Sequence, residues 1–223
     1  MARLGVPWRE LDELDLSGLN PVLLMSHLAC ADEPEHPLNA QQLARFANAR
    51  QRLPGVPSSL ANSPGLFLSP EYAGDLARAG IVLYGGLANP ADGSLECVAT
   101  LRAQVLSVRS VEAGDTVGYG ATWVAGQPSQ LATVAIGYAD GLPRALSNRG
   151  WLTWRGERCP IRGRVSMDLV TVDITGLTEP PGEGDWLEVF GPTSSISELA
   201  AAADTIDYTL LTGLSGRPTV QVV

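Results

Sequence analysis

The first residues that could carry chemistry lie close together near the N-terminus. His27, Cys30, Asp32 and His36 are all possible metal ligands, and protein metal sites do use local His and Cys ligands at such spacings. However, no second pair of such ligands occurs elsewhere in the sequence, and two prolines in this stretch indicate a loop. We therefore interpret His27 as a hydrogen-bonded histidine at the end of a strand, and we predict no metal site.

A second set of polar residues lies where we expect buried strands to end. His27 comes near the end of one apolar run, Asn62 and Ser63 follow the next, and Arg78 directly precedes a third. Parallel α/β folds place their functional sites at the carboxyl ends of the strands. This spacing therefore favours a site that combines these side chains.

Two further segments could bind an anion or act as a base. Ser63-Pro-Gly and Gly80-Ile81 could present backbone N–H groups to an anion, although glycine more often simply makes a turn. Tyr138 lies in Ile136-Gly-Tyr-Ala-Asp-Gly, where it could be only an aromatic residue before a turn. A tyrosine that acts as a base needs a nearby positive charge to lower its pKa from about 10, and Arg144 and Arg164 are candidates for that charge.

The first half of the chain alternates strand-like and helical segments. Residues 22–29 form a continuous apolar run, as in a strand buried on both faces, and residues 58–62 and 80–84 are two further expected strands. We expect helices over residues 7–14, from the N-cap Asn39 to the prolines at 54–57, and from Ser69 onward. Repeated βα units of this kind imply a parallel sheet or barrel.

The second half has a different pattern. Short runs, many of them rich in β-branched residues, are separated by turn residues, which predicts an all-β domain interrupted by one helix over 196–203 with Ser195 or Ser197 as its cap. We place the domain boundary in the loop near residue 92, which gives domains over 1–92 and 93–223. The expected strands lie at 104–108, 116–119, 133–137, 151–154, 168–174 and 186–190.

The first domain is too small for the barrel that its pattern indicates. Three βα units cannot close an eight-stranded barrel, which needs roughly 250 residues. We therefore expect residues 1–92 to be the back half of a (β/α)8 barrel, and the chain to be truncated or to be one part of a split protein.

Composition excludes several classes of protein. The formal net charge is −9, which argues against nucleic acid as a partner. The longest apolar runs are far too short to span a membrane, and no signal peptide precedes them. The three cysteines form neither a disulfide framework nor a zinc pattern, so we expect a cytoplasmic protein. All 15 basic residues are Arg, and without lysine no side chain of this sequence can form a Schiff base with a carbonyl.

Seven motifs, in order, resemble the fold-type III, pyridoxal 5′-phosphate (PLP)-dependent alanine racemases, and the resemblance covers essentially the whole chain. They are Met1-Ala-Arg-Leu-Gly, Ser26-His-Leu-Ala-Cys-Ala-Asp-Glu, Ser59-Leu-Ala-Asn-Ser, Arg78-Ala-Gly-Ile-Val-Leu-Tyr-Gly, Gly137-Tyr-Ala-Asp-Gly, Gly163-Arg-Val-Ser-Met-Asp and Ile206-Asp-Tyr. The resemblance implies an N-terminal (β/α)8 barrel that holds PLP, a C-terminal β-domain, and a homodimer with a shared site. It also implies interconversion of L-alanine and D-alanine, which supplies D-alanine for peptidoglycan.

The resemblance also assigns roles to individual residues. Tyr138 matches the catalytic tyrosine, and Arg78 matches the arginine that holds the cofactor's ring nitrogen unprotonated, supported by His27. The other matched positions are phosphate or cofactor contacts at Asn62, Ser63, Gly80, Ile81 and Tyr208, a cofactor and substrate contact at Arg3, a substrate-pocket position at Met167, and entrance-corridor positions at Asp32 and Arg164.

In the family, a tyrosine and a lysine act as bases on opposite faces of the substrate, and PLP accepts the electrons of the deprotonated Cα. The front of the barrel, where the resemblance places that lysine, has no counterpart in this sequence, and Ala79 replaces a usual proline. We therefore predict that this polypeptide alone is not a competent racemase, and that an upstream barrel segment supplies the lysine.

Three alternatives stay open at this point. The chain could be a non-catalytic relative that binds PLP or a partner, which the absence of lysine favours. It could be a racemase or decarboxylase-like relative that acts on another small amino acid. A β-barrel interaction domain of the translation-factor kind would explain only the second half, and it would leave the motifs between His27 and Gly85 without a role.

Overall fold

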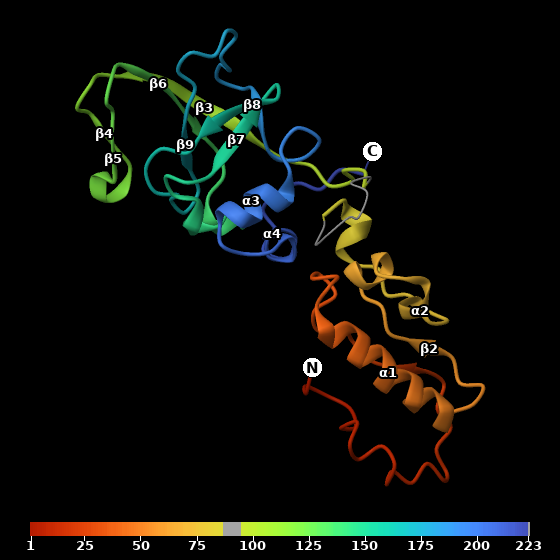
Figure 1. The fold of residues 1–223 in the computed structure, drawn as a ribbon. Helices are drawn as coiled ribbons and strands as arrows, with labels where there is room; N and C mark the ends of the chain where they lie inside the picture. The colour runs from red at the N-terminus through yellow and green to blue at the C-terminus, as the bar shows by residue number, and fades with distance from the viewer. Residues whose placement is uncertain (87–94, 223) are drawn as a thin grey trace. The chain divides into compact units, whose positions relative to one another are not determined.

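A computed structural model describes residues 1–86 and 95–222 of the chain. These residues form two compact units, Met1–Glu96 and Cys97–Val223, whose elements are drawn in Figure 1. The boundary that we predict near residue 92 lies outside the described residues. The two units are described one at a time below.

A parallel βαβ arrangement forms the centre of the first unit, as its sequence pattern predicts. Strand β1 (Leu24–Met25) leads through helix α1 (Pro37–Arg52) to strand β2 (Ser58–Ser59), and the two strands pair in parallel. The 3-10 helix η1 (Pro64–Phe67), helix α2 (Pro70–Ala73) and the 3-10 helix η2 (Ile81–Tyr84) follow. The core beneath them is small and consists of Leu28, Ala31, Phe46, Leu60, Ala61 and Tyr72.

The start of helix α1 differs from the prediction. The N-cap is His36, whose Nδ1 accepts a hydrogen bond from the backbone N–H of Leu38, and not Asn39. Asn39 lies inside the helix, almost fully buried, and its amide donates to the carbonyl oxygens of Cys30 and Glu33. A proline at the first helical position explains the earlier start, because it needs no N–H partner there. His36 thus has a structural role in the stretch that we examined for metal ligands.

Other predictions for the first unit are wrong or only partly right. Residues 7–14 form turns closed by i to i+3 hydrogen bonds instead of a helix; residues 1–10 are exposed, and a short helix without a packed face is marginal. The strand expected over 22–29 is short, and its Val22 and Met25 are 79% and 60% exposed. Residues 81–84 form η2 instead of a strand. Gly80 precedes this helix as its N-cap, with its N–H bonded to the Ser63 hydroxyl, and Gly85 ends the helix at φ +77°.

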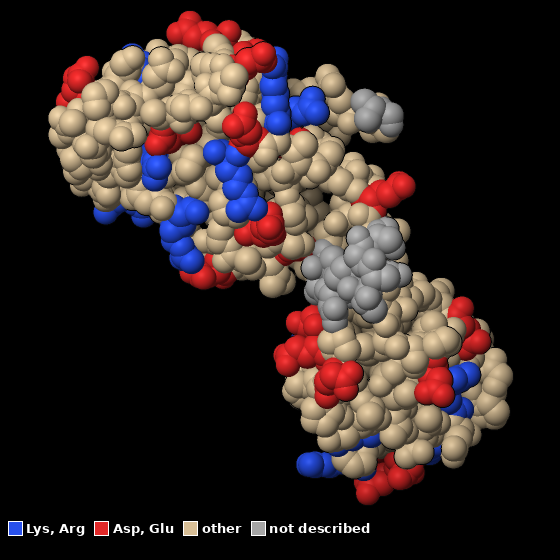
Figure 2. Space-filling model, turned by 45° about the horizontal axis from the view of Figure 1, so that its top comes forward, with Lys and Arg blue, Asp and Glu red and all other residues tan. Residues whose placement is uncertain are grey.

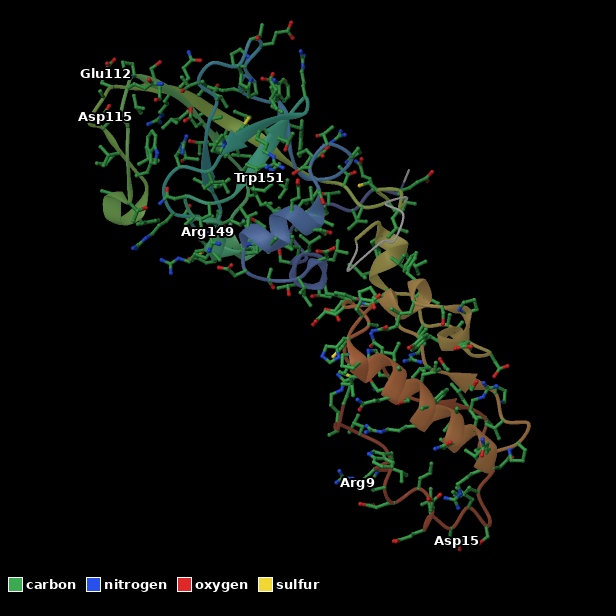
Figure 3. All side chains as sticks on the ribbon, viewed as in Figure 1. Arg9, Asp15, Glu112, Asp115, Arg149 and Trp151 are labelled. Carbon is green, nitrogen blue, oxygen red and sulfur yellow. The ribbon has the colours of Figure 1, made fainter. Side chains whose placement is uncertain are left out.

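The second unit is β-rich, as predicted. Its main sheet has the order β8-β7-β10-β3-β6-β9, and every pair in it is antiparallel. The strands are β3 (Leu101–Val111), β6 (Ser129–Val134), β7 (Trp151–Trp154), β8 (Glu157–Pro160), β9 (Val170–Asp173) and β10 (Trp186–Phe190). A separate two-stranded ribbon consists of β4 (Thr116–Val117) and β5 (Trp123–Val124), and Glu112 and Asp115, labelled in Figure 3, make the turn that leads into it.

Short helical segments complete the second unit. The 3-10 helices are η3 (Tyr119–Ala121), η4 (Tyr138–Asp140) and η5 (Arg144–Leu146). Helix α3 (Ile196–Ala202) has Ser195 as its cap, one of the two serines that we proposed, and helix α4 (Asp207–Thr212) follows it. Helix α4, which has only six residues, and the edge strand β8, which begins with the charged pair Glu157 and Arg158, were not predicted.

Strands β7 and β10 have the predicted bounds, whereas β6 lies four residues earlier at its start than the strand predicted over 133–137. The chain leaves the sheet after Val134 because Gly137 and the residues that follow it turn against the loop around Met167. Two further strands are shorter than expected. The strand predicted over 116–119 is Thr116–Val117, and the strand predicted over 168–174 is Val170–Asp173.

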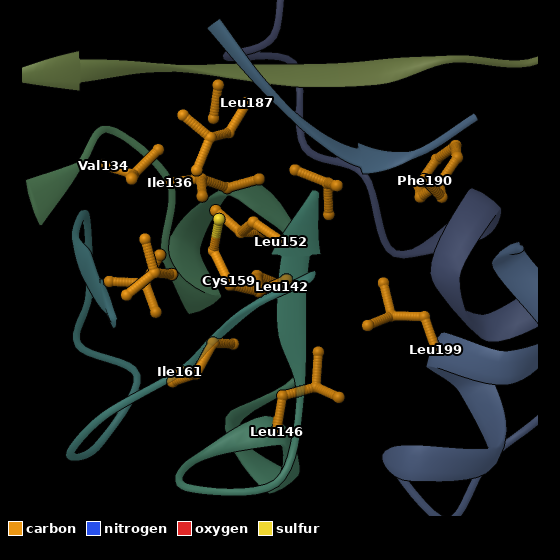
Figure 4. Close-up of a cluster of buried hydrophobic side chains, with 14 of the residues drawn as sticks. Val134, Ile136, Leu142, Leu146, Leu152, Cys159, Ile161, Leu187, Phe190 and Leu199 are labelled. Atoms are coloured by element: carbon orange, nitrogen blue, oxygen red, sulfur yellow. The ribbon is translucent and has the colours of Figure 1, made fainter. Parts of the chain in front are cut away.

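A single buried cluster joins the sheet of the second unit to its helices (Figure 4). Leu187 and Leu152 come from neighbouring strands β10 and β7, and Leu199 of α3 is fully buried in the same cluster. Cys159 is also fully buried there, and burial raises the pKa of its thiol to about 11. This thiol therefore stays protonated and behaves as a small apolar side chain.

On the face drawn in Figure 2, basic and acidic side chains are interspersed over the surfaces of both units. Among the residues that the structure describes, no helix combines the length and the apolar character that crossing a bilayer requires. Within the same residues, His, Cys, Asp and Glu side chains do not gather in groups of three or more that could hold a metal ion.

Candidate functional site

The guanidinium of Arg78 is the most extensively bonded charged group in the first unit's candidate site. Its Nη1 donates to Ser59 Oγ at 2.6 Å, and its Nη2 donates to the carbonyl oxygens of Ser26 at 2.7 Å and Leu60 at 3.3 Å. The same Nη2 lies 3.1 Å from Nδ1 of His27. These partners come from β1, β2 and the residues that follow them, so the parallel strand pair itself positions the guanidinium.

Burial and nearby positive charges together favour the neutral form of His27. Burial lowers the pKa of His27, and the positive charges of Arg78, Arg3 and the N-terminal amine lower it further. Burial also lowers the pKa of Arg78, but a guanidinium stays protonated in proteins. His27 is therefore neutral near pH 7, and a neutral Nδ1 can accept a hydrogen bond from Arg78.

Gln42 of helix α1 fixes the backbone that directly follows the ring of this histidine. Gln42 Nε2 donates to the carbonyl oxygen of His27 at 2.9 Å, and Gln42 Oε1 accepts from the N–H of Ala29 at the same distance. On the other side of the ring, His27 Nε2 lies 3.4 Å from Asn62 Nδ2. The structure thus brings together His27, Asn62 and Arg78, the polar side chains that we expected to combine in one site.

Ser63 and the residues around Gly80 form a second cluster in the first unit. Ser63 is 3% exposed, and its Oγ accepts from the N–H of Gly80 at 2.8 Å and lies 3.5 Å from the N of Val82. Ile81, which begins η2, is also buried. A hydroxyl and backbone N–H groups that converge on one point are donors that suit a phosphate.

Ser59 is a member of this site that sequence reasoning missed. It is fully buried, and its hydroxyl makes one of the two shortest bonds to Arg78. The residue lies within the motif Ser59-Leu-Ala-Asn-Ser, but a serine in a short strand carries no signal of its contact with a side chain 19 residues later. The contact exists only in the folded chain, where the N–H of Arg78 donates to the carbonyl oxygen of Ala61 at 3.1 Å, just after β2.

Two predicted residues of the first unit lie at its surface. Arg3 is exposed and lines a cavity of about 940 Å³ that also includes Ser26, next to His27. Its positive charge reaches His27, whose pKa it lowers. Asp32 is exposed in the turns that lead to α1, where His36 forms the helix cap.

In the second unit, Tyr138 lies on a turn that packs against a second loop. The N–H of Tyr138 donates to the carbonyl oxygen of Ser166 at 3.0 Å, and the N–H of Ala139 donates to that of Met167 at 2.9 Å. A side chain on Gly137 would collide with both carbonyl oxygens, so only glycine permits this close approach. The phenol of Tyr138 and the side chain of Met167 are 45% and 54% exposed.

Arg164 lies against a glycine turn. A Cβ atom on Gly120 would lie 3.3 Å from the guanidinium carbon of Arg164, and a Cβ atom on Gly118 would lie 3.3 Å from the backbone N of Arg164. Both glycines have φ near +74°. Asn148 links the same two segments, because its Oδ1 accepts from the N–H of Gly163 and its Nδ2 donates to Thr122 Oγ1.

Tyr208 lies in the first turn of α4 and is 37% exposed. The carbonyl oxygen of Tyr208 accepts a hydrogen bond from the hydroxyl of Thr212 at 2.7 Å. The structure thus brings together two sets of the sequence-predicted residues, which are the arginine, histidine and serine cluster of the first unit and the Tyr138 and Met167 turns of the second. Arg3, Asp32, Arg164 and Tyr208 belong to neither set.

Comparisons with known proteins cover both units. The family model "Alanine racemase, N-terminal domain" matches residues 1–88, and the model "Alanine racemase, C-terminal domain" matches residues 98–222. The chain is 47% identical to an alanine racemase of Rhodospirillum rubrum and 45% identical to a catabolic alanine racemase of Agrobacterium fabrum. In each case the match covers 97% of this chain but only 60% and 58% of the relative.

Solved structures give the same result. An alanine racemase from Bartonella henselae with covalently bound pyridoxal phosphate superposes with a TM-score of 0.88 at 39% identity, over 97% of this chain and 62% of that one. A biosynthetic alanine racemase from Pseudomonas aeruginosa gives a TM-score of 0.86 at 39% identity, over 97% and 63%. The chain therefore spans less than two thirds of the length of these relatives.

Proposed function

The chain belongs to the alanine racemase family, whose fold combines a barrel N-terminal domain with a β-rich C-terminal domain, and we propose that it forms part of a PLP-dependent alanine racemase. The observation that carries this proposal is the Arg78–His27 pair beside the buried Ser63 hydroxyl. The proposed reaction interconverts L-alanine and D-alanine, and it would supply D-alanine for peptidoglycan.

The residues of the first unit fit the proposed cofactor. Arg78 would hold the ring nitrogen of PLP, and Ser63, Gly80 and Ile81 would hold its phosphate. Tyr208 is a further proposed phosphate contact. Supporting this, the Ser63 hydroxyl and the Gly80 N–H already lie 2.8 Å apart, and the Arg78 guanidinium is fixed by neutral partners. When bound, PLP supplies an electron sink for the deprotonated Cα of the substrate. The remaining proposed contacts are Asn62 and Arg3 with the cofactor, and Asp32 and Arg164 at the entrance.

The chain's own residues would then handle the substrate and its proton. Arg78 keeps its proton and so leaves the ring nitrogen unprotonated. Tyr138 would take the Cα proton on one face of the substrate, and Arg3 and Met167 would contact the substrate. The opposite face needs a second base that can also bind PLP, and this sequence contains no lysine. We propose that a lysine outside these 223 residues supplies it.

The remaining parts of the proposal concern organisation. We propose that residues 1–92 are the back half of a (β/α)8 barrel and that residues 93–223 are the β-domain. We also propose a cytoplasmic homodimer in which Tyr138 of one copy serves the site of the other. The lengths of the relatives support an additional barrel segment, because this chain matches only about three fifths of each.

The test is racemisation of L-alanine by a completed enzyme. The chain is co-expressed with the barrel segment of the Rhodospirillum rubrum racemase that its match leaves uncovered, and D-alanine formation is measured with added PLP. We expect turnover that Tyr138→Phe lowers by at least about 100-fold, since it removes a proton-transfer group. Tyr119→Phe is the matched control, because Tyr119 is 73% exposed on η3 of the same unit, and it should keep full activity. Absence of turnover in the completed enzyme, or full activity of Tyr138→Phe, would contradict the proposal.

A further inference from the structure

The side chain of Arg217, near the C-terminus, ties together two turns of the second unit. Its Nη1 donates to Asp168 Oδ1 at 2.6 Å, and its Nε lies 3.2 Å from Asp140 Oδ1. Asp140 ends η4, which carries Tyr138, and Asp168 directly follows Met167. One guanidinium therefore bridges the two turns that the proposed function makes essential.

The Asp140 carboxylate also accepts a hydrogen bond from the residue directly before Tyr138. Its Oδ2 accepts from the N–H of Gly137 at 2.9 Å, and the side chain of Asp140 is only 11% exposed. The carboxylate thus holds the backbone on the N-terminal side of Tyr138 and the guanidinium of Arg217 at the same time. Removing Arg217 would leave a largely buried carboxylate without its ion-pair partner, which is costly.

The segment that carries Arg217 is itself held against the same turn. The N–H of Ser215 donates to the carbonyl oxygen of Asp140 at 3.2 Å, and the Ser215 hydroxyl accepts from the N–H of Arg217 at the same distance. Gly141 approaches the backbone of the residues around Gly213 so closely that a Cβ atom would collide with it. Backbone contacts therefore place Arg217 beside this turn independently of the bonds that its side chain makes.

We propose that Arg217 is a positioning residue for Tyr138: its guanidinium holds the Tyr138 turn and the Met167 turn in fixed relation. The inference rests on the proposed function for the importance of Tyr138 but not for the contact itself. Arg217 does not meet the substrate in this account and acts only through Asp140 and Asp168. The hydrogen bond to Asp168 and the charge of Asp140 raise the pKa of Arg217, as expected for a guanidinium whose charged form is stabilised by these contacts.

The first test is amide hydrogen exchange in the 223-residue chain with Arg217→Gln. We expect the amides of Gly137, Tyr138 and Ala139 to exchange about tenfold faster, because their acceptors belong to the clamped turns. Amides in β6 and β9 should keep their rates. Arg217→Lys keeps the charge but cannot bond both carboxylates in a fixed fork, so it should restore part of the protection.

The matched control is Arg149→Gln. Arg149 makes an exposed ion pair with Asp204 in the same unit, at 2.6 Å, so the change also removes one bonded guanidinium. It should leave exchange at Tyr138 unchanged. Equal exchange at Tyr138 in Arg217→Gln and the parent chain would overturn the proposal, and it would do so whatever the chain's activity.

The second test separates this inference from the proposed function. In the completed racemase, Arg217→Gln should lower kcat by about tenfold with little change in KM, because it misplaces a base without removing a substrate contact. Faster exchange together with an unchanged kcat would overturn the positioning role while Tyr138→Phe still reports on the proposed function. If Tyr138→Phe is itself fully active, the proposed function fails, whereas the exchange result still decides whether Arg217 clamps the turns.

Discussion

The guanidinium of Arg78 is held in position by neutral hydrogen-bond partners, which do not neutralise its charge. A carboxylate partner would bind the guanidinium more strongly, but it would cancel the field that the group presents to a ligand. Here the acceptors are the Ser59 hydroxyl, two backbone carbonyl oxygens and the ring of a neutral His27. The guanidinium is therefore oriented and keeps its full charge for an acceptor such as a pyridine nitrogen.

The pKa of His27 should depend on the positive charge of Arg78. Because the folded chain lowers the pKa of His27, the unfolded chain binds more protons once the pH falls to the ordinary value of 6.5. The free energy of unfolding should therefore fall as the pH drops through about 6.5. Arg78→Gln removes one cause of the shift and should raise the pKa of His27, as measured by NMR titration of its ring. His36, the only other histidine, is the internal reference, and an unchanged or lower pKa of His27 would refute this prediction.

Ser59→Ala should lower the stability of the first unit at the Arg78 site. It removes the acceptor 2.6 Å from Arg78 Nη1 at a fully buried position, and hydrogen bonds to charged groups contribute about 1.5–3 kcal/mol. We expect the free energy of unfolding to fall by about 1–2 kcal/mol, since Arg78 keeps its carbonyl partners. Ser69→Ala is the control, because the Ser69 hydroxyl makes no capping bond to α2. Equal urea midpoints for the two variants would show that the Ser59 contact contributes nothing.

At the scale of elements, short turns rather than long strands carry the candidate residues of the second unit. The Tyr138 turn has a 3-10 helix of three residues, and its position depends on backbone contacts to Ser166 and Met167. Such a turn has little stability of its own. Its geometry therefore depends on the loop it packs against and on Asp140.

Gly137→Ala tests how tightly those turns fit. The added methyl group would collide with backbone carbonyl oxygens, which cannot rotate away as a side chain could. We expect a loss of about 1–3 kcal/mol in the free energy of unfolding, measured in urea, and displaced NMR signals of Tyr138. Gly126→Ala is the control, because nothing lies within 4 Å of a Cβ atom built there and its φ is not positive. Equal free energies of unfolding for the two variants would contradict the inference that the turns fit closely at Gly137.

The helices and strands differ in how well they can be predicted from the sequence. Trp151–Trp154 and Trp186–Phe190 were predictable because β-branched and aromatic residues stand between clear turns. Residues 80–84 have the same apolar character, but residues 81–84 form a 3-10 helix that follows Gly80, whose N–H is bonded to the Ser63 hydroxyl. An apolar run of that length cannot be assigned by periodicity alone. The hydroxyl that binds Gly80 lies 17 residues away in the sequence.

The candidate site shows the same division. His27 and Asn62 at expected strand ends, and Arg78 directly before an expected strand, were expected to combine in one site, and the structure brings these side chains together. Ser59 and Arg217 carry no such signal, since each acts through a contact that exists only after folding. The roles of Ser63, Tyr138 and Tyr208 came from the family resemblance, and the matches over both units confirm that family.

At the scale of the whole molecule, the first unit leaves large apolar side chains exposed. Leu4, Val22 and Met25 are 99%, 79% and 60% exposed on and before β1. Apolar surface of this kind favours association. We expect the isolated chain to self-associate in sedimentation experiments as its concentration rises, and Val22→Ser with Met25→Ser to reduce this. A sharp monomer boundary for the parent chain at all concentrations would contradict the expectation.

The most direct test of the central claim is PLP binding to this chain, measured by equilibrium dialysis and followed by borohydride reduction and intact mass. We expect reversible binding of PLP. Arg78→Gln and Ser63→Ala should each weaken this binding by about tenfold, which corresponds to about 1.4 kcal/mol. Ser69→Ala should bind as the parent does. Because the chain has no lysine, borohydride should fix no pyridoxyl group to a side chain. Equal PLP binding by all four proteins, or no binding by the parent, would show that the Arg78 and Ser63 cluster is not the cofactor site.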